Sequence, residues 1–450
     1  MQKIAIVLAA GKGTRMKSAH AKAAHQLCGK PMIAWVCDAV RDAGYETIYV
    51  VCGHRADEIQ EILGDSVTYV QQDQQLGTGH AVQVALAAVT DVDQAQVLVT
   101  CGDTPLLRSE TLEALTETSN PAAVRVLSTV LADPFGYGRI VREKGAVCRI
   151  VEEKDANEQE KGIQEINVGT YVFDLAFLRR AIQALTTDNA QGELYLTDLI
   201  ASAHTEGVGA DAFLMPDANE SLGVNNRKQL ARAQGLMQMR INDHWLDQGV
   251  SMTNPAAITI EADVSLEADV TLEAPVALKG HTSVASGTVI GMNCELIDAQ
   301  IGQDCHIKQA VIWDAIVGKR VNIGPFAYLR PGTVLADQVK IGDFVEVKNS
   351  HVGQGSKIPH LSYMGDADIG SGVNIGCGSI TCNYDGKKKY RTTIEDHAFI
   401  GSNTNLIAPV TVGQHAYIAA GATIRKDVKG ESLSFMDYKL KTRDDWNKDK

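Results

Sequence analysis

The sequence predicts two domains of different architecture: a Rossmann-like α/β domain with a mostly parallel sheet, followed by a parallel β-helix of hexapeptide repeats. Three observations lead to this prediction. At 450 residues the chain is too long for one ordinary core. In its first half, apolar strand-like runs alternate with helical patterns. In its second half, aliphatic residues recur at every sixth position.

The first half contains apolar runs of the length expected for buried strands. Between the first two runs, the segment Pro31–Ala43 has apolar residues at the i, i+3, i+4, i+7 spacing of one helical face, namely Ile33, Val36, Cys37 and Val40. Strand–helix alternation with continuous apolar strands indicates a parallel sheet covered on both faces, which binds ligands at the carboxyl ends of its strands. The predicted strands are Ile4–Leu8, Thr47–Cys52, Val67–Val70 and Gln96–Thr100.

The second half has a period of six, which neither an α-helix nor a two-residue strand alternation explains. One series is Ile260, Leu266, Leu272, Leu278, Val284 and Ile290, and a second is Val264, Val270, Val276, Thr282 and Thr288. Hexapeptide repeats are typical of a solenoid in which each short face contributes one inward aliphatic side chain. The repeat is interrupted around Pro359–Asp368 and Thr381–Thr393, where we expect loops on a binding face.

These patterns predict four segments. We expect the α/β domain over residues 1–225 and a helical linker over residues 226–248, with the helix at Asn226–Asp247. Residues 249–430 form the β-helix, and residues 431–450 a C-terminal tail.

Composition excludes several classes of protein. The net charge of −13 is opposite to what a nucleic-acid binder needs, and no apolar run is long enough to span a bilayer. The N-terminal apolar stretch has no cleavage pattern of a signal peptide. Nine scattered cysteines indicate reduced thiols, and Cys377 and Cys382 lack the second pair that a zinc finger needs. We therefore expect a cytoplasmic protein without nucleic-acid or membrane partners.

The loop after the first strand, LAAGKGTRM at residues 8–16, is rich in glycine and carries Lys12 and Arg15. Backbone N–H groups in such a loop can approach phosphates, although an ordinary turn has the same composition. The P-loop pattern is absent, and the dinucleotide fingerprint lacks its third glycine, because Met16 stands there. Asp103, after the strand ending at Thr100, suits Mg²⁺ on nucleotide phosphates or a helix cap. Gln72 and the LGTGH segment that follows could read a base edge.

Taken together, the motifs resemble the bacterial N-acetylglucosamine-1-phosphate uridyltransferases, which are fused to a glucosamine-1-phosphate N-acetyltransferase with a left-handed β-helix. The resemblance covers residues 1 to about 430 in order and is carried by LAAGKGTRM, QLGTGHA, GDTPLL, FGYGRIVR, IVEEKDA, EINVGTYVF and GVNNR. It implies a nucleotide site in which Arg15 and Lys22 contact the triphosphate of UTP, and Asp103 and Asn225 hold Mg²⁺. The remaining nucleotide- and sugar-binding residues that it implies are Leu8, Ala9, Ala10, Gly11, Gln72, Gly77, Thr78, Cys101, Gly102, Gly138, Glu152 and Asn167.

The β-helix carries a second set of residues. Acetyl transfer from a thioester to an amine needs a base, and His360 in PHLSYMGD suits that role at neutral pH. The resemblance implies that His360 is the general base, that Glu346 and Asn383 orient it or the amine, and that sites are shared between subunits of a homotrimer. The residues it assigns to the glucosamine phosphate and acetyl-CoA are Arg330, Lys348, Tyr363, Asn374, Cys377, Asn383, Tyr384, Lys389, Ser402 and Ala420.

The chain departs from the family pattern at several positions. The lysine loop reads HAKAAHQL, where a proline usually precedes the lysine; Cys101 and Cys377 replace other small or aromatic residues; and Pro359 precedes His360. Asp437 stands where an arginine commonly binds acetyl-CoA, for which Arg425, Lys426 or Lys439 could substitute. Two alternatives stay open: a nucleotidyltransferase whose solenoid serves trimerisation or regulation, and a catalytically dead scaffold.

Overall fold

The fold is described from a computed structural model, which covers residues 2–117, 122–444 and 446. The chain divides into two compact units, Met1–Met237 and Gln238–Lys450, and the helix α8 (Arg227–Asp247) spans the division. Parts of the predicted tail, residues 445 and 447–450, lie outside the described residues. No helix in the described part is long and apolar enough to cross a membrane.

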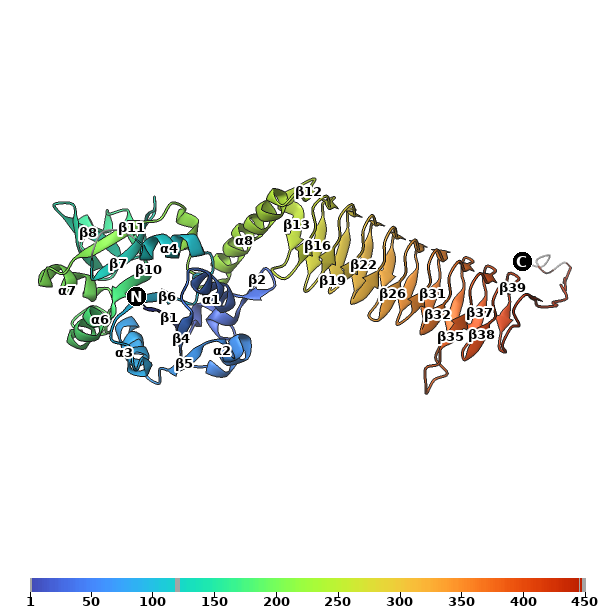
Figure 1. The fold of residues 1–450 in the computed structure, drawn as a ribbon, viewed down its shortest axis with the longest axis horizontal. Coiled ribbons are helices and arrows are strands. Elements are labelled where there is room, and N and C mark those ends of the chain that lie inside the picture. Colours follow the sequence, from blue (N-terminus) through green and yellow to red (C-terminus); the bar gives the residue numbers. More distant parts are fainter. Residues whose placement is uncertain (1, 118–121, 445, 447–450) are drawn as a thin grey trace. The chain divides into compact units, whose positions relative to one another are not determined.

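The first unit is built on one sheet with the order β11-β7-β10-β6-β1-β4-β5, and the β8–β9 hairpin pairs with β10 (Figure 1). β10 is antiparallel to both neighbours and the other pairs along this order are parallel, so the sheet is mostly parallel, as predicted. The strands are β1 (Gln2–Ala9), β4 (Thr47–Cys52), β5 (Thr68–Gln71), β6 (Ala95–Cys101), β7 (Val124–Val130), β8 (Arg139–Glu143), β9 (Ala146–Val151), β10 (Glu165–Asp174) and β11 (Ala210–Leu214).

Helices cover both faces of this sheet, because each central strand is apolar on both sides. In β1, Ile4 and Ile6 belong to one core cluster, whereas Ala5 and Val7 belong to the other. The first cluster contains the buried faces of α3 (Thr78–Ala88), α6 (Leu175–Ala181) and α7 (Asp198–Glu206). The second contains those of α1 (Met32–Asp42), α2 (Ala56–Leu63) and α4 (Ser109–Thr116). The predicted apolar face of α1 is buried as expected.

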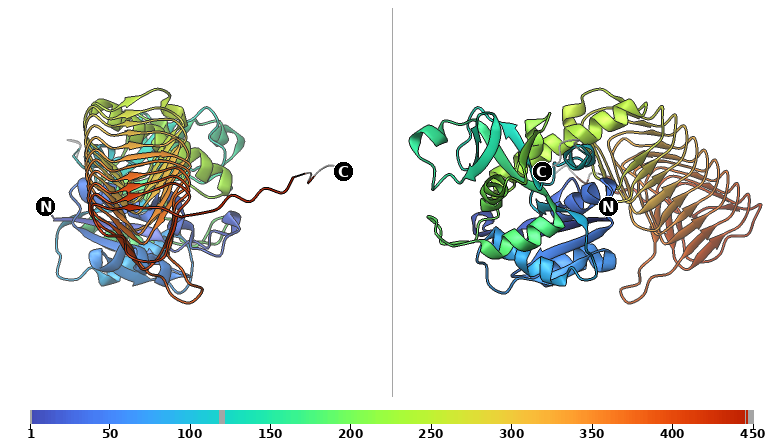
Figure 2. Two further views of the ribbon diagram at one scale, coloured as in Figure 1. Left: turned by 90° about the vertical axis from the view of Figure 1, so that its right-hand side faces the viewer. Right: turned by 60° about the vertical axis from the view of Figure 1, so that its left-hand side comes forward.

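The second unit is a left-handed β-helix of three long parallel sheets, whose coils stack one on another (Figures 1 and 2). Eleven strands run from β12 (Ser251–Met252) to β41 (Leu433–Ser434), ten from β13 (Ile258–Ile260) to β40 (Thr423–Ile424), and nine from β14 (Ser265–Leu266) to β38 (Val410–Val412). Ile258 pairs with Val276, so one coil takes three hexapeptides.

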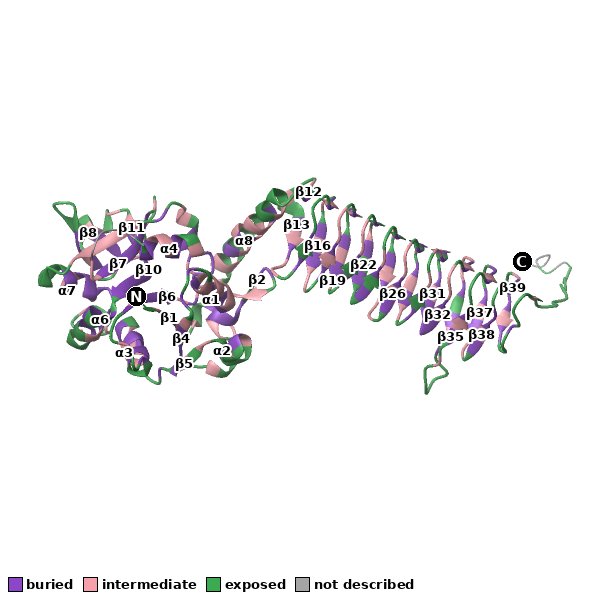
Figure 3. Cartoon of the chain, in the orientation of Figure 1, coloured by how far each residue is buried: buried purple, intermediate pink, exposed green. Residues whose placement is uncertain are grey.

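Both six-residue series point into the coils, where one continuous cluster forms the core. Leu278 and Ile290 are fully buried, and so are Thr282 and Thr288 of the second series. Figure 3 shows this as buried segments alternating with exposed ones along every coil. Since no coil can bury its own aliphatic row, stacking supplies the burial, worth about 1.5–3 kcal/mol for each such side chain.

One of the two expected interruptions is wrong. Residues 359–368 form no loop: β30 (Lys357–His360), β31 (Tyr363–Gly365) and β32 (Ala367–Ile369) keep the ladder, with Glu346 opposite Tyr363 and His351 opposite Asp368. Polar residues mask the repeat there without lengthening the coil. The second interruption is confirmed. Ala367 pairs with Thr392, and the extra residues form a loop that projects from the stack beside β35 (Thr392–Ile394; Figure 1).

Candidate functional sites

The first candidate site lies at the carboxyl ends of β1 and β6, two neighbouring parallel strands. Leu8 pairs with Cys101, so the glycine-rich loop and Asp103 leave the sheet side by side. Gly13 has φ +58°, and a Cβ atom there would lie 2.8 Å from the Cβ of Lys22. Glycine is therefore needed at this position, because it lets the loop fold back against Lys22.

Lys22 joins the two predicted metal ligands. Its ammonium contacts the Asp103 carboxylate and lies 3.1 Å from the Asn225 side-chain oxygen. Arg15 donates to the same Asn225 oxygen at 2.9 Å. Two oxygen ligands from distant parts of the chain thus converge on one cation, as a small divalent metal with phosphate and water as its other ligands would need.

A cavity of about 270 Å³ opens beside these groups. Gln72, at its wall, is 4% exposed and pairs with His80 at 3.0 Å, and its amide lies 3.5 Å from the Gly77 carbonyl. Gly77 has φ +113°, and a Cβ atom there would lie 2.5 Å from the Leu194 carbonyl oxygen. The lining residues that were predicted are Leu8, Ala9, Ala10, Gly11, Lys22, Gln72, Gly77, Thr78, Cys101 and Asp103.

A second cavity shares Cys101 and Asp103 with the first and also contains Arg15 and Asn225. Phe135 stands at this cavity with 76% of its surface exposed. Three predicted sugar-binding residues come together nearby. The Asn167 backbone N–H donates to the Gly138 carbonyl at 2.8 Å, and a Cβ atom on Gly138 would lie 3.4 Å from the Glu152 carboxylate. Burial raises the pKa of Glu152, and Thr197 donates to its carboxylate at 3.3 Å.

The second candidate site follows one corner of the β-helix, where a residue recurs once in each coil. His360, at the end of β30, pairs with Asp343, at the end of β27 (Lys340–Asp343), and the His360 Nδ1 atom lies 2.6 Å from Asp343 Oδ1. A Cβ atom on Gly376 would lie 2.5 Å from the Ser402 amide nitrogen, and one on Gly401 would lie 2.5 Å from that of Ala420. The corner column is therefore Asp343, His360, Cys377, Ser402 and Ala420.

Three cations gather beside the adjoining sheet: Arg330 and Lys348 at the ends of two of its strands, and Lys389 in the inserted loop. Lys348, at the end of β28 (Glu346–Lys348), has a lowered pKa, chiefly because the Lys389 ammonium lies beside it, with further contributions from burial and Arg330. Arg330 donates to Glu346 at 2.8 Å. Glu346 was expected to orient His360 or the amine, but its partner here is Arg330. Like charges held together in this way form a site for an anion such as phosphate.

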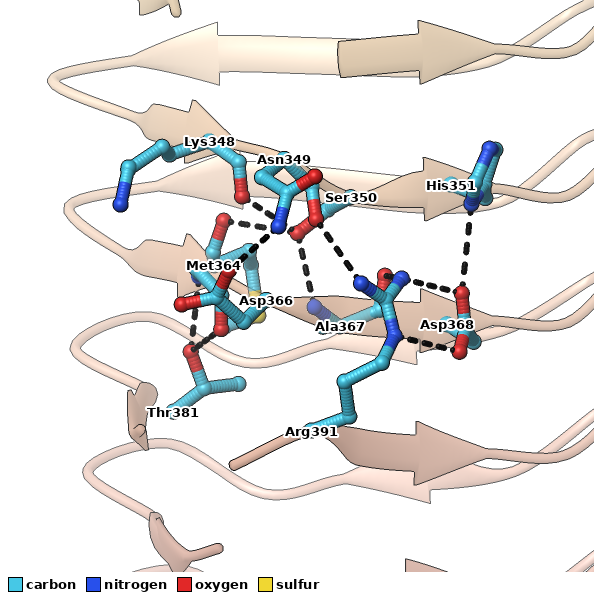
Figure 4. A network of polar contacts seen from close by, with 11 residues as sticks. Lys348, Asn349, Ser350, His351, Met364, Asp366, Ala367, Asp368, Thr381 and Arg391 are labelled. Atoms are coloured by element: carbon cyan, nitrogen blue, oxygen red, sulfur yellow. Dashed lines mark hydrogen bonds and ion pairs between the residues drawn. The ribbon is translucent and has the colours of Figure 1, made fainter. Parts of the chain in front are cut away.

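Asp366 holds this cluster in place from below the surface. It is 5% exposed and accepts hydrogen bonds from the side chains of Asn349 and Asn383, while Lys348 and Lys389 help to lower its pKa. Figure 4 shows Asn349 and Asp366 on successive coils, and Arg391 reaching Asp368, to which its Nε atom donates at 2.8 Å. The polar network anchors both ends of the inserted loop next to the three cations.

Comparisons with known proteins match both halves of the chain. The MobA-like NTP transferase domain family matches residues 5–166, and the bacterial transferase hexapeptide family, with six repeats, matches residues 391–426. The bifunctional protein GlmU of Heliobacterium modesticaldum is 48% identical over 448 residues, covering 99% of this chain and 98% of that protein. The GlmU of Exiguobacterium sibiricum is 46% identical over 449 residues, covering 99% and 100%.

The chain belongs to the GlmU family. The predicted resemblance is therefore confirmed, and with it the two-part fold and the bifunctional enzyme class, a nucleotidyltransferase combined with an acetyltransferase. The two alternatives, a nucleotidyltransferase with an inert solenoid and a dead scaffold, lose their support.

The remaining site residues predicted for a GlmU-type enzyme are placed as follows. The Gly102 amide donates to the Leu8 carbonyl at 2.9 Å and fixes the start of the Asp103 loop. Asn374 and Tyr363 are half-buried on β33 (Asn374–Ile375) and β31, whereas Tyr384, Ser402 and Ala420 are exposed. The three candidate replacements for the missing arginine, Arg425, Lys426 and Lys439, are also exposed, as is Asp437.

Two departures from the GlmU pattern have a structural explanation. Ala21, in the usual proline position, has φ −57°, which a proline would also adopt, and its N–H donates to Glu58 at 2.7 Å. That hydrogen bond restrains the backbone before Lys22, as the ring of a proline would. Burial raises the pKa of Cys101 to about 12, so its thiol stays neutral beside Asp103.

Sequence reasoning missed several residues of both sites. Gln75 and Glu193 line the first cavity, and Tyr137 and Gln229 line the second. In the β-helix it missed Asp343. The coil length was the available signal for that residue, because Asp343 precedes His360 by 17 residues, the same separation as that between paired residues Lys348 and Gly365. Gln75 and Tyr137 stand inside the motifs QLGTGHA and FGYGRIVR, which were the available signal, whereas no quoted motif contains Glu193 or Gln229.

Proposed function

We propose that the chain makes UDP-N-acetylglucosamine in two steps at two separate sites. Glucosamine 1-phosphate is first acetylated by acetyl-CoA, and N-acetylglucosamine 1-phosphate then receives the uridylyl group of UTP with release of pyrophosphate. The observation that carries the proposal is that one polypeptide of the GlmU family holds both a convergent Lys22–Asp103–Asn225 cluster and a His360 column beside three cations. Residues 1–225 would carry the uridylyl transfer and residues 249–430 the acetyl transfer.

In uridylyl transfer, a phosphate oxygen of the sugar phosphate attacks the α-phosphorus of UTP, and the bond to the pyrophosphate oxygen breaks. The protein supplies no nucleophile, so position and charge must supply the rate. Gln72 and the Gly77 backbone hold the uracil, and Arg15 and Lys22 hold the triphosphate. Asp103 and Asn225 would hold Mg²⁺, which neutralises the phosphate charge when bound. Their convergence on the Lys22 ammonium supports that assignment.

The sugar of this step would occupy the second cavity, since it meets the first at Asp103. Gly138 leaves room for a ligand beside Glu152, and Asn167 is held next to this space by its backbone hydrogen bond to the Gly138 carbonyl. Glu152 is half-buried with a raised pKa, so it is suited to a hydrogen bond with a sugar hydroxyl or the acetamide.

In acetyl transfer, the amine nitrogen attacks the thioester carbonyl, His360 takes the amine proton, and coenzyme A leaves as the thiol. Arg330, Lys348 and Lys389 would bind the sugar phosphate, which explains why three cations are held together. Tyr363, Asn374 and Asn383 would contact the sugar and its amine, and Tyr384 the acetyl group. Cys377, Ser402 and Ala420 continue the His360 column coil by coil, so acetyl-CoA would lie along that corner.

We further propose a homotrimer. Large apolar side chains are exposed on the β-helix, where a monomer would leave them in water. Phe326 and Phe344 stack with ring centroids 5.3 Å apart, and both are more than half exposed. Trp313, Ile316 and Leu361 are exposed as well. Light scattering at low micromolar concentration should give three times the chain mass of 48.4 kDa, and a monomer mass would contradict the proposal.

The chain would act in the cytoplasm, where UTP and acetyl-CoA are available and thiols stay reduced. Its nine cysteines are free thiols, consistent with a reducing compartment.

The experiment that tests the function is an assay of the purified protein with glucosamine 1-phosphate, acetyl-CoA, UTP and Mg²⁺, following free thiol and pyrophosphate separately. His360→Ala should abolish thiol release and leave pyrophosphate release from pre-formed N-acetylglucosamine 1-phosphate intact, and Asp103→Ala should do the reverse. Each variant is the matched control of the other. Wild-type protein that releases pyrophosphate but no thiol at high acetyl-CoA would support a nucleotidyltransferase alone.

A further inference from the structure

The contact between Asp343 and His360 has no part in the roles assigned so far. It joins the ends of two paired strands, β27 and β30, and its 2.6 Å separation is that of a charge-assisted hydrogen bond. The Leu361 N–H donates to the Asp343 carbonyl at 2.9 Å, which fixes the backbone next to both side chains. The side chains are 58% and 40% exposed, so a substrate can reach the imidazole.

We propose that Asp343 is the positioning residue of the acetyltransfer base: it accepts a hydrogen bond from His360 Nδ1 and leaves Nε2 free to take the amine proton. The inference rests on the proposed role of His360. The hydrogen bond from His360 lowers the pKa of Asp343, so the carboxylate is ionised at neutral pH. An ionised carboxylate can only accept, and Nδ1 must therefore carry the hydrogen.

The other groups around His360 do not offer this contact. The strands that pair with β30 contribute Lys340, on β27, and the uncharged Asn374, on β33, while Lys357 lies three residues away on β30 itself. Cys377 follows one coil later in the corner column. Of these groups, Asp343 alone combines a negative charge with a direct hydrogen bond to the ring.

The carboxylate acts in two ways that can be separated. It restricts the ring to one tautomer and one orientation, and it stabilises the imidazolium that forms when the amine proton arrives. Removing only the charge tests the second effect, and removing the whole side chain tests both effects together.

The test compares Asp343→Ala, which removes both effects, with Asp343→Asn, whose amide oxygen still accepts from Nδ1–H without the charge. A matched control exists in the chain: His351 and Asp368 have the same 17-residue spacing on another sheet, with Nδ1 and Oδ1 3.2 Å apart. The control variant His351→Ala removes a histidine–aspartate contact of the same type, while Asp368 keeps its hydrogen bonds from Arg391.

For Asp343→Ala we expect kcat for thiol release to fall about tenfold, a fraction of what a general base contributes, with KM for glucosamine 1-phosphate unchanged. Asp343→Asn should keep the Nδ1–H form and give a kcat between those of wild type and Asp343→Ala. Uridylyl transfer should be unchanged in both, and the unchanged KM for glucosamine 1-phosphate reports that the acetyltransfer site is still folded. In ¹⁵N spectra of the histidine rings, with the signal identified by His360→Gln, Asp343→Ala should lose the Nδ1–H form. His351→Ala should change none of these quantities.

Wild-type kcat and an unchanged ¹⁵N signal in Asp343→Ala would overturn the inference, as would a loss confined to KM. Failure of the underlying function looks different. If His360→Ala keeps acetyl transfer, the proposed base is wrong whatever the Asp343 variants do. If His360→Ala abolishes it and Asp343→Ala does not slow it, only the positioning role is refuted.

Discussion

The three-cation cluster of the β-helix allows a quantitative prediction from one substitution, Lys348→Met. Methionine keeps most of the apolar stem and removes the ammonium. Because Lys389 lies beside Lys348 and lowers its pKa, the cluster holds its charges against a mutual repulsion that Asp366 offsets in part and a bound anion would relieve further. Loss of one charge should therefore weaken binding of the sugar phosphate without disturbing the neighbouring coils.

The expected size follows from Coulomb's law. A phosphate charge about 4 Å from an ammonium gains roughly 4 kcal/mol at an effective dielectric constant near 20. Water and salt reduce this at an open site, and removing Lys348 also relieves its repulsion with Lys389, so about 1.5–2 kcal/mol should remain. At 1.4 kcal/mol for each factor of ten, KM for glucosamine 1-phosphate should rise roughly 10- to 30-fold.

The assay is thiol release against glucosamine 1-phosphate at saturating acetyl-CoA, at pH 7 and constant salt. KM for acetyl-CoA and the rate of uridylyl transfer should stay within twofold of wild type. Lys319→Met, at an exposed lysine whose backbone N–H is bound to Asp337, is the matched control and should have no effect. A KM within twofold of wild type in Lys348→Met would refute the view that this cluster binds the phosphate.

Three further outcomes are expected. Lys389 holds the pKa of Lys348 below that of an ordinary lysine, so KM for glucosamine 1-phosphate should begin to rise at a lower alkaline pH than an ordinary lysine would give. Lys389→Met should shift that rise to higher pH. An unshifted pH profile of KM would count against the coupling of the two lysines. Gly13→Ala should slow uridylyl transfer at least tenfold, because the added methyl group displaces Lys22. The control Gly64→Ala, at a similar φ of +55° with open space around it, should only lower the free energy of unfolding by about 1 kcal/mol. Equal uridylyl transfer rates in the two variants would disprove the role of the contact between Gly13 and Lys22. Leu296→Ala, at a fully buried position of the β-helix, should cost about 2–5 kcal/mol in denaturant unfolding, and a loss below about 1 kcal/mol would mean that the coil collapses around the cavity.

The local order of elements could be read from the chain, because it follows from periodicity. The strand Thr47–Cys52 was predicted with the bounds that the structure has, and the helix predicted over Asn226–Asp247 is α8, Arg227–Asp247. The six-residue repeat predicted the solenoid, since each inward aliphatic residue can be buried only by a neighbouring coil. The repeat also gave one wrong result at residues 359–368, because polar side chains in a site hide the repeat without lengthening the coil.

Motifs determined the family and most of the candidate site residues, because the groups that contact ligands follow glycine-rich turns and strand ends. Only the tertiary structure decided which of them meet. Asn225 reaches Lys22 and Arg15 across more than 200 residues of sequence, and Glu346 pairs with Arg330. Asp343 meets His360 because the coil length brings residues 17 apart into register. Such contacts depend on the geometry of whole sheets and coils, which no short stretch of sequence determines.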